Sequence, residues 1–194
     1  MPSASADDLP LLEFATPDAW RAWLHEYHAT QRGAWVKFAK RGAPRQTIDY
    51  AQALEVALCY GWIDSQVRRL DESFYRQRFT PRGRRSRWSQ INREKAIELI
   101  ERGLMQGPGL AEVRQAQADG RWEAAYASPS RAAPPRDFLD ALAENPTAAD
   151  FYSTLSSANR YALIFRIEEA KRPQTRARRI AKFVEMLEAH QTFH

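Results

Sequence analysis

The sequence has little of what exported or membrane-spanning proteins usually carry. It contains one cysteine, Cys59, and therefore cannot form a disulfide within the chain. No apolar run approaches the roughly 20 residues that a transmembrane helix needs. The start of the chain, Met1–Phe14, shows neither the basic residues nor the long apolar stretch of a secretory signal. These absences favour a reducing compartment, and we expect a cytoplasmic protein.

The motifs of common cofactor and catalytic sites are also missing. The sequence has no phosphate-binding glycine loop, no G-x-S-x-G elbow and no CxxC pair. His25 and His28 lie close together in the sequence, but no further cluster of histidine, cysteine or acidic residues completes a metal site. We therefore expect surface histidines, no metal and no cofactor.

What the sequence does have is concentrated positive charge. Its 194 residues include 29 basic and 24 acidic side chains, a net charge of +5. The segment Ser65–Lys95 alone carries nine arginines and one lysine against three acids, a net charge of +7. Guanidinium groups beside aromatic surface are suited to holding an anion or a flat acidic group. Four aromatic residues are interleaved with the charges of this segment: Phe74, Tyr75, Phe79 and Trp88.

The hydrophobic pattern predicts an α+β fold, with a small antiparallel or mixed sheet in the N-terminal half and an all-helical C-terminal half. Residues 34–40 alternate as a strand, with Trp35 and Lys37 on one face. Two further strands are predicted at 65–70 and 73–80, and we expect them to form a hairpin. On the last of these strands, alternation places Phe74, Arg76 and Arg78 on one face and Tyr75, Gln77 and Phe79 on the other.

Capping residues and prolines predict where the helices begin. We expect helices to start near Thr16, Asp49, Ser89, Gly107, Pro134, Asn145, Ser156 and Pro173. The stretch 128–135, which is rich in proline and serine, is the best candidate for a linker. The resulting domains are a flexible arm at residues 1–13, an α+β domain at 14–127 and a helical domain at 134–194.

The corner that leads into the basic segment, Leu58–Ser65, is the first candidate site. Trp62 could form the flat wall of a pocket in which Asp64 orients an arginine or a ligand amine. Alternatively, Trp62 belongs to the core and Asp64 is a turn acid paired with Arg68 or Arg69. Cys59 is either a small buried hydrophobe or a remote nucleophile candidate, although no histidine lies near it in the sequence.

The loop from Arg78 to Ser89 is the second candidate, because a helix is expected to begin directly after a group of arginines. A helix N-terminus beside guanidinium groups favours anion binding. The alternative is a solvated basic loop that pairs with acids elsewhere. Together with the preceding corner and hairpin, the loop predicts a basic aromatic cleft formed by Trp62, Asp64, Arg68, Arg76, Arg78, Arg82, Arg87 and Trp88.

A third basic cluster, Lys171–Lys182, contains six basic residues and no acid. It lies near the expected start of a helix, where the helix dipole disfavours positive charge. This conflict indicates an acidic partner or ligand. The alternative is pairing within the chain, with the nearby acids Glu168, Glu169, Glu185 and Glu188.

Several blocks of the sequence resemble the bacterial YdeI/OmpD-associated family, whose members are described as bacteriocin-protection proteins. The resemblance implies a role in resistance to bacteriocins or cationic antimicrobial peptides and an outer-membrane porin as partner. It brings no catalytic residue, cofactor or substrate. The blocks that carry it are Trp20–Leu24, Ala57–Asp64, Arg78–Asn92, Gly120–Tyr126 and Arg172–Arg176.

Three functions are compatible with these features. The first is a stress-protection binding protein whose basic aromatic cleft engages an anionic small molecule or an acidic protein. The second is a nucleic-acid-binding protein that uses the basic hairpin and the helix at 171–182. The third is an enzyme that acts on an anionic substrate through Asp64 and the arginines. Direct capture of cationic peptides by the basic segment is not expected, because like charges repel.

Overall fold

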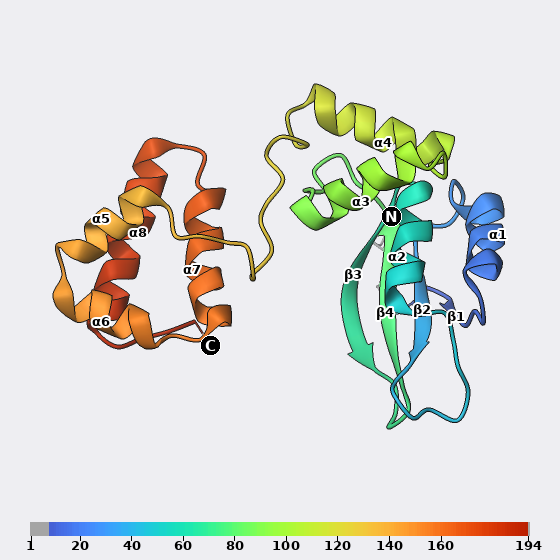
Figure 1. Ribbon diagram of the computed structural model, residues 1–194, viewed down its shortest axis with the longest axis horizontal. Coiled ribbons are helices and arrows are strands. Elements are labelled where there is room, and N and C mark those ends of the chain that lie inside the picture. The colour runs from blue at the N-terminus through green and yellow to red at the C-terminus, as the bar shows by residue number, and fades with distance from the viewer. Residues whose placement is uncertain (1–7, 194) are drawn as a thin grey trace. The chain divides into compact units, whose positions relative to one another are not determined.

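The computed structural model describes residues 8–193 (Figure 1). The chain forms two compact units, Met1–Ala125 and Tyr126–His194. Each unit contains a hydrophobic core of its own. Residues 1–7 of the expected N-terminal arm lie outside the described part of the chain. Among the described residues, no helix is long and apolar enough to cross a membrane.

The first unit is built on a four-stranded mixed sheet with the strand order β1-β2-β4-β3. Strand β1 pairs parallel to β2, whereas β2 with β4 and β3 with β4 pair antiparallel. The last two strands form the hairpin that the sequence predicts. The first strand was not predicted, because two residues are too few to show alternation. The strands are β1 (Leu11–Leu12), β2 (Ala34–Ala39), β3 (Trp62–Arg69) and β4 (Phe74–Pro81).

Four helices of this unit begin where the capping signals place them. The Thr16 hydroxyl accepts a hydrogen bond from the Ala19 amide (3.3 Å), and the Ser89 hydroxyl accepts one from the Asn92 amide (3.1 Å). Asp49 forms a reciprocal capping box with Gln52. Each cap satisfies an amide that would otherwise lack a partner. The helices are α1 (Pro17–Tyr27), α2 (Tyr50–Cys59), α3 (Gln90–Glu101) and α4 (Gly107–Ala118).

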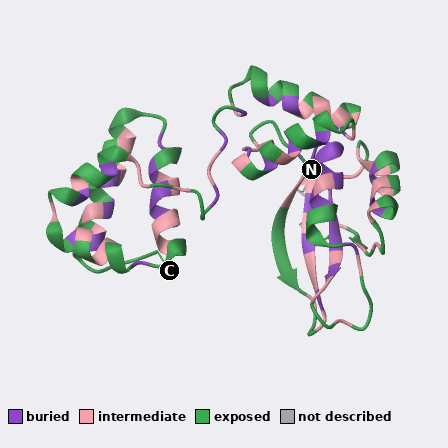
Figure 2. Cartoon of the chain, in the orientation of Figure 1, coloured by how far each residue is buried: buried purple, intermediate pink, exposed green. Residues whose placement is uncertain are grey.

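The core of the first unit lies between the helices and one face of the sheet. Figure 2 shows buried residues along β2 and β4, whereas β3 is largely exposed. Trp20 of α1 packs edge-on against Phe79, with ring centroids 5.8 Å apart, and its indole N–H donates to the Ala53 carbonyl of α2 (3.1 Å). Trp62 also belongs to this core and donates to the His28 carbonyl (3.2 Å). The burial of each such ring stabilises the fold by roughly 2–3 kcal/mol.

Helix α4 approaches the end of α2 very closely. Gly61, with a φ of 72°, follows α2 in a left-handed conformation that glycine adopts readily. The Gln106 amide donates to the Cys59 carbonyl (3.1 Å) at the end of α2. A Cβ atom on Gly109 would lie only 2.4 Å from this same carbonyl oxygen. The close contact between the two helices therefore requires glycine, which has no side chain, at position 109.

The second unit consists of four helices around an apolar core, and within the described residues the strand elements all lie in the first unit. Phe138, Leu163, Ile167 and Leu187 are almost completely buried in this core. As predicted, prolines or N-cap side chains mark the helix starts. The helices are α5 (Arg136–Ala143), α6 (Pro146–Thr154), α7 (Ser157–Glu169) and α8 (Pro173–Glu188).

One arginine, Arg176, connects three of these helices. The Arg176 guanidinium of α8 donates to both carboxylate oxygens of Asp137 on α5, at 2.5 and 2.8 Å. It also donates to the Ile167 carbonyl of α7 (3.2 Å). The hydrogen bonds from Arg176 hold the pKa of the Asp137 carboxyl below its usual value. The pair therefore links pH to the stability of the second unit.

Replacing Gly109 by alanine is expected to destabilise the protein by about 1–3 kcal/mol, because the new methyl group overlaps the backbone of α2. Chemical denaturation measures this change in the free energy of unfolding. Gly107→Ala is the matched control in the same helix, because a Cβ there meets no atom within 4 Å. Equal stability of the two variants would contradict the close approach of α4 to α2.

Asp137→Asn is expected to cost about 0.5–1 kcal/mol at neutral pH, because the ion pair is partly exposed to solvent. A lowered pKa in the folded state means that the stabilisation is complete above the ordinary aspartate pKa of about 3.9. It is lost as the pH falls through the lower value of the folded protein. Unfolding curves of wild type and variant should therefore differ at pH 7 and converge in strong acid. A difference that persists unchanged in strong acid would contradict this assignment.

Candidate functional site

The candidate site lies on the sheet face opposite the core. Val36 and Phe79 point toward the helices, so their neighbours along β2 and β4 point the other way. The register pairs Trp35 with Arg78 and Lys37 with Arg76. Residues paired directly across two strands share a face. We call this surface the basic sheet face, and it is formed by Trp35, Lys37, Arg68, Phe74, Arg76 and Arg78.

Two aromatic rings form the floor of the basic sheet face. The Arg76 and Arg68 guanidinium carbons lie 4.4 and 5.3 Å from the centre of the Trp35 ring, which is completely buried. The Lys37 Nζ atom lies 3.9 Å from the centre of the Phe74 ring. Each such cation–π contact contributes about 0.5–2 kcal/mol. Charged side chains therefore lie over both rings.

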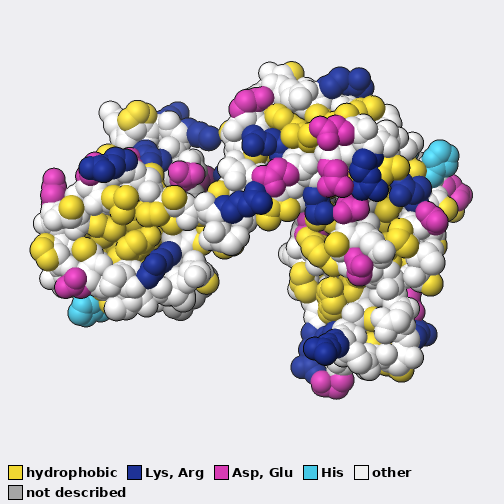
Figure 3. Space-filling view, in the orientation of Figure 1, with side chains coloured by type: hydrophobic (Ala, Val, Ile, Leu, Met, Phe, Trp, Pro, Cys, Tyr) yellow, Lys and Arg dark blue, Asp and Glu magenta, His cyan; other side chains and the backbone are white. Residues whose placement is uncertain are grey.

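Three cations form a row across the sheet. Lys37 of β2 lies directly opposite Arg76 of β4, and Arg76 lies directly opposite Arg68 of β3. Like charges in such positions repel each other and destabilise the sheet. Glu13 compensates part of this charge, because its carboxylate pairs with Lys37 (3.0 Å) and with Arg45 (2.7 Å). Lys37, Arg76 and Arg68 thus place three positive charges side by side, and one of them pairs with Glu13. On the side of the molecule drawn in Figure 3, where α2 lies in front of the sheet, Lys and Arg side chains also gather over the end of β3.

Arg76 and Arg78 have no carboxylate partner among the described residues. Arg78 donates through Nε to the Ser65 hydroxyl (2.9 Å). The Nε atom of Arg76 is buried and has no hydrogen-bond partner in the described part of the chain. Both residues are half-buried. A stacked guanidinium with free edges can bind a carboxylate or phosphate through two parallel hydrogen bonds.

The structure places Trp62 and Asp64 on the other face of the sheet. The Asp64 carboxylate accepts hydrogen bonds from the Tyr50 hydroxyl (2.9 Å) and from the Gln77 amide (2.9 Å). Its partners are therefore neutral side chains rather than Arg68. An irregularity in β3 just after Asp64 shifts the pairing with β4. The sequence gives no signal for this bulge, and the faces of β3 could not be assigned without it.

The loop before α3 brings together Arg82, Arg87 and Trp88. Arg82 is only 6% exposed, and its guanidinium carbon lies 3.6 Å from the centre of the Trp88 ring. It donates to the Arg87 carbonyl (3.2 Å), and the Trp88 ring packs against Trp122 with centroids 4.8 Å apart. Arg82 thus supports the loop from inside. The eight residues of the predicted cleft therefore lie in three places: the basic sheet face, the helix-covered face and this loop.

Cys59 and the basic cluster 171–182 are the remaining candidates from the sequence. Cys59 is almost completely buried, and burial raises the pKa of its thiol. It is a small buried hydrophobe, as one of the two alternatives predicts. In the cluster 171–182, Arg176 pairs with Asp137 and Arg179 lies 3.6 Å from Glu169. Within the described residues, no group of three or more histidine, cysteine or acidic side chains could hold a metal ion.

Glu13 and Arg45 complete the basic sheet face, and neither was predicted from the sequence. Glu13 directly follows β1 and Arg45 lies in the loop after β2, so neither belongs to a periodic pattern. The sequence did signal the two residues at its centre, because alternation placed Trp35 and Lys37 on one face. What it lacked was the register that sets them beside the arginines of β4.

Two family models match the chain. One is described as a domain of unknown function, DUF8412, and matches residues 12–112, which include the basic sheet face. The other is described as "Bacteriocin-protection, YdeI or OmpD-Associated" and matches residues 132–190. No curated protein and no solved structure matches the chain.

The second match confirms the family resemblance and contains the block Arg172–Arg176. Three other blocks that resemble the same family fall within the range of the first model. The first match covers more than half of the chain. The chain therefore belongs to the DUF8412 family, and its residues 132–190 match the model of the YdeI/OmpD-associated, bacteriocin-protection family.

Proposed function

We propose that this is a bacteriocin-protection-type binding protein that engages an anionic ligand or an acidic partner through its basic sheet face. One observation carries the proposal: Lys37, Arg76 and Arg68 form a cross-strand row of cations on a sheet face that reaches solvent. A row of like charges across paired strands weakens the sheet. Local features that cost stability are typical of functional sites.

The chemistry of the row favours carboxylate or phosphate groups. The Arg76 guanidinium lies over the Trp35 ring, and a guanidinium over an aromatic face can still donate from its edge to an acidic group. An acidic group could bind there and neutralise the repulsion between the strands. The site is a sheet face rather than a deep cavity, which suits an extended acidic surface more than a fully enclosed small molecule.

Nucleic acid is the less well supported ligand. Proteins that bind single strands without sequence preference stack bases on exposed aromatic rings. Trp35 is completely buried and Phe74 is only 7% exposed, so neither ring offers a free surface to a base. An enzyme that uses Cys59 is supported still less, because burial favours the neutral thiol over the nucleophilic thiolate.

Arg76→Met is expected to weaken binding of poly-L-glutamate or pyrophosphate about tenfold at ~50 mM salt, because one charge-assisted hydrogen-bonding group is lost. Stability should change by less than about 1 kcal/mol, since the methionine stem still covers Trp35 and the loss of repulsion offsets the lost cation–π contact. Titration of a labelled probe and chemical denaturation measure the two effects.

The matched control is Arg114→Met, which removes the same charge from an exposed position of α4. It should bind both probes like the wild type. Arg76→Lys should lie between wild type and Arg76→Met, because lysine keeps the charge but not the planar fork. Binding that is equally weak in Arg114→Met would show a response to net charge alone. Stronger binding to a short RNA than to either probe would favour the nucleic-acid alternative.

A further inference from the structure

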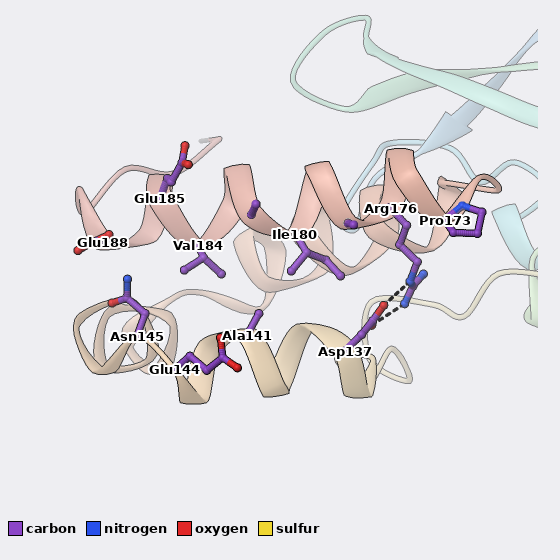
Figure 4. A pocket seen from close by; sticks show the side chains of 12 residues that line it. Asp137, Ala141, Glu144, Asn145, Pro173, Arg176, Ile180, Val184, Glu185 and Glu188 are labelled. Carbon is purple, nitrogen blue, oxygen red and sulfur yellow. Dashed lines mark hydrogen bonds and ion pairs between the residues drawn. The ribbon is translucent and has the colours of Figure 1, made fainter.

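The second unit contains a groove between α5 and α8 with a volume of about 660 Å³. Figure 4 shows the two helices side by side, with Ala141 of α5 facing Ile180 and Val184 of α8. Short side chains leave the groove open, because Ala177 and Ala181 also line it. The floor is therefore apolar: Ile180 is only 7% exposed, Val184 is half-buried and Ala181 is exposed.

The charged residues around this floor are mainly acidic. Four carboxylates and one guanidinium line the groove. The guanidinium, Arg176, is already engaged by Asp137 across one end of the groove (Figure 4). The other three carboxylates form no ion pair within the described residues, and they are Glu144, Glu185 and Glu188. On a chain with a net charge of +5, this groove is locally negative.

We propose that the groove binds a cationic amphipathic helix of a partner peptide or protein. Apolar side chains of the partner would pack on Ile180 and Val184, and its lysine or arginine residues would lie against the glutamates. Both walls are helices whose backbone groups are bonded internally, so they offer no edge to an extended peptide. A helical partner satisfies its own backbone and needs only an apolar stripe.

The length of the groove fits such a partner. Its lining residues recur every three or four positions along α8, from Arg176 to Glu188. At 1.5 Å per residue this stretch is about 18 Å long, which corresponds to roughly three turns of a bound helix. The groove lies in the other unit from the basic sheet face and takes ligands of the opposite charge. The inference therefore goes beyond the proposed function and does not depend on it.

Ala181→Lys tests the proposal on the full chain. Ala181 is an exposed helical position, where lysine is well tolerated, but the new side chain fills the groove and repels a cationic partner. The probe is a labelled synthetic helix of about 15 residues with a leucine stripe and flanking lysines. Fluorescence anisotropy at ~50 mM salt should show at least about tenfold weaker binding than for the wild type.

Ala143→Lys is the matched control, because it adds the same charge to an exposed position of α5 outside the groove. It should bind the probe like the wild type. The double variant Glu144→Gln, Glu188→Gln should weaken binding about fivefold, since two exposed charge pairs are lost. A probe that differs only by a central proline, which breaks its helix, should bind at least about tenfold more weakly than the unbroken helix.

Two results would overturn the proposal on binding grounds: no binding of the helical probe by the wild type, or equal binding by wild type and Ala181→Lys. Light scattering tests whether a second copy of the chain occupies the groove instead. A dimer of the wild type that dissociates in Ala181→Lys would place a second copy of the chain in the groove and would overturn the proposal as well. A wild type whose mass is that of one chain, with probe binding lost in Ala181→Lys and kept in Ala143→Lys, supports it.

Discussion

The alternation of side chains along β2 and β4 is the constraint on which the first unit depends. Val36 and Phe79 face the helices and are completely buried, whereas Lys37 and Arg76 face the other way. A slip of one residue would turn these cations into the core and the apolar residues into solvent. Since burying an unpaired charge costs far more than any single contact contributes, the register is fixed by charge as much as by hydrophobicity.

The same alternation makes the cations part of the fold. Trp35 lies on the face away from the helices and is nevertheless completely buried, with the guanidinium groups of Arg68 and Arg76 over its ring. The aliphatic stems of these arginines supply apolar cover, and the guanidinium groups remain at the surface. Like-charge repulsion therefore destabilises the sheet by about 0.2–1 kcal/mol per pair, while the same side chains cover the tryptophan. An anion bound to the row would keep the cover and remove the repulsion.

Local signals predicted most of the fold. Each helix start depends on a cap or a proline within a few residues, so Thr16, Asp49 and Ser89 could be identified as starts without knowing the tertiary structure. The hairpin was equally local. Strand β1 was missed because its two residues are held by pairing with β2 rather than by any pattern of their own.

The site was less predictable because it depends on pairing between strands. The sequence placed Arg76 and Arg78 on one face of a strand, and the structure retains that placement. It could not show that Arg68 joins them while Asp64 does not, because a bulge in β3 separates the two. What the sequence did show of the site was a tryptophan and a lysine at alternate positions of one strand, together with a nearby segment rich in arginine.

The family description also changes how the charge of the chain bears on its function. The bacteriocin-protection match covers residues 132–190, whereas the +7 segment, Ser65–Lys95, lies outside it. Repulsion between that segment and a cationic peptide therefore does not exclude contact between such a peptide and the second unit. The charged residues that line the groove of the second unit are mainly carboxylates. Net charge describes neither surface, because a field within a Debye length of about 8–10 Å is set by the nearest charges. Two surfaces of opposite sign can serve two different ligands on one chain, and neither ligand competes for the site of the other.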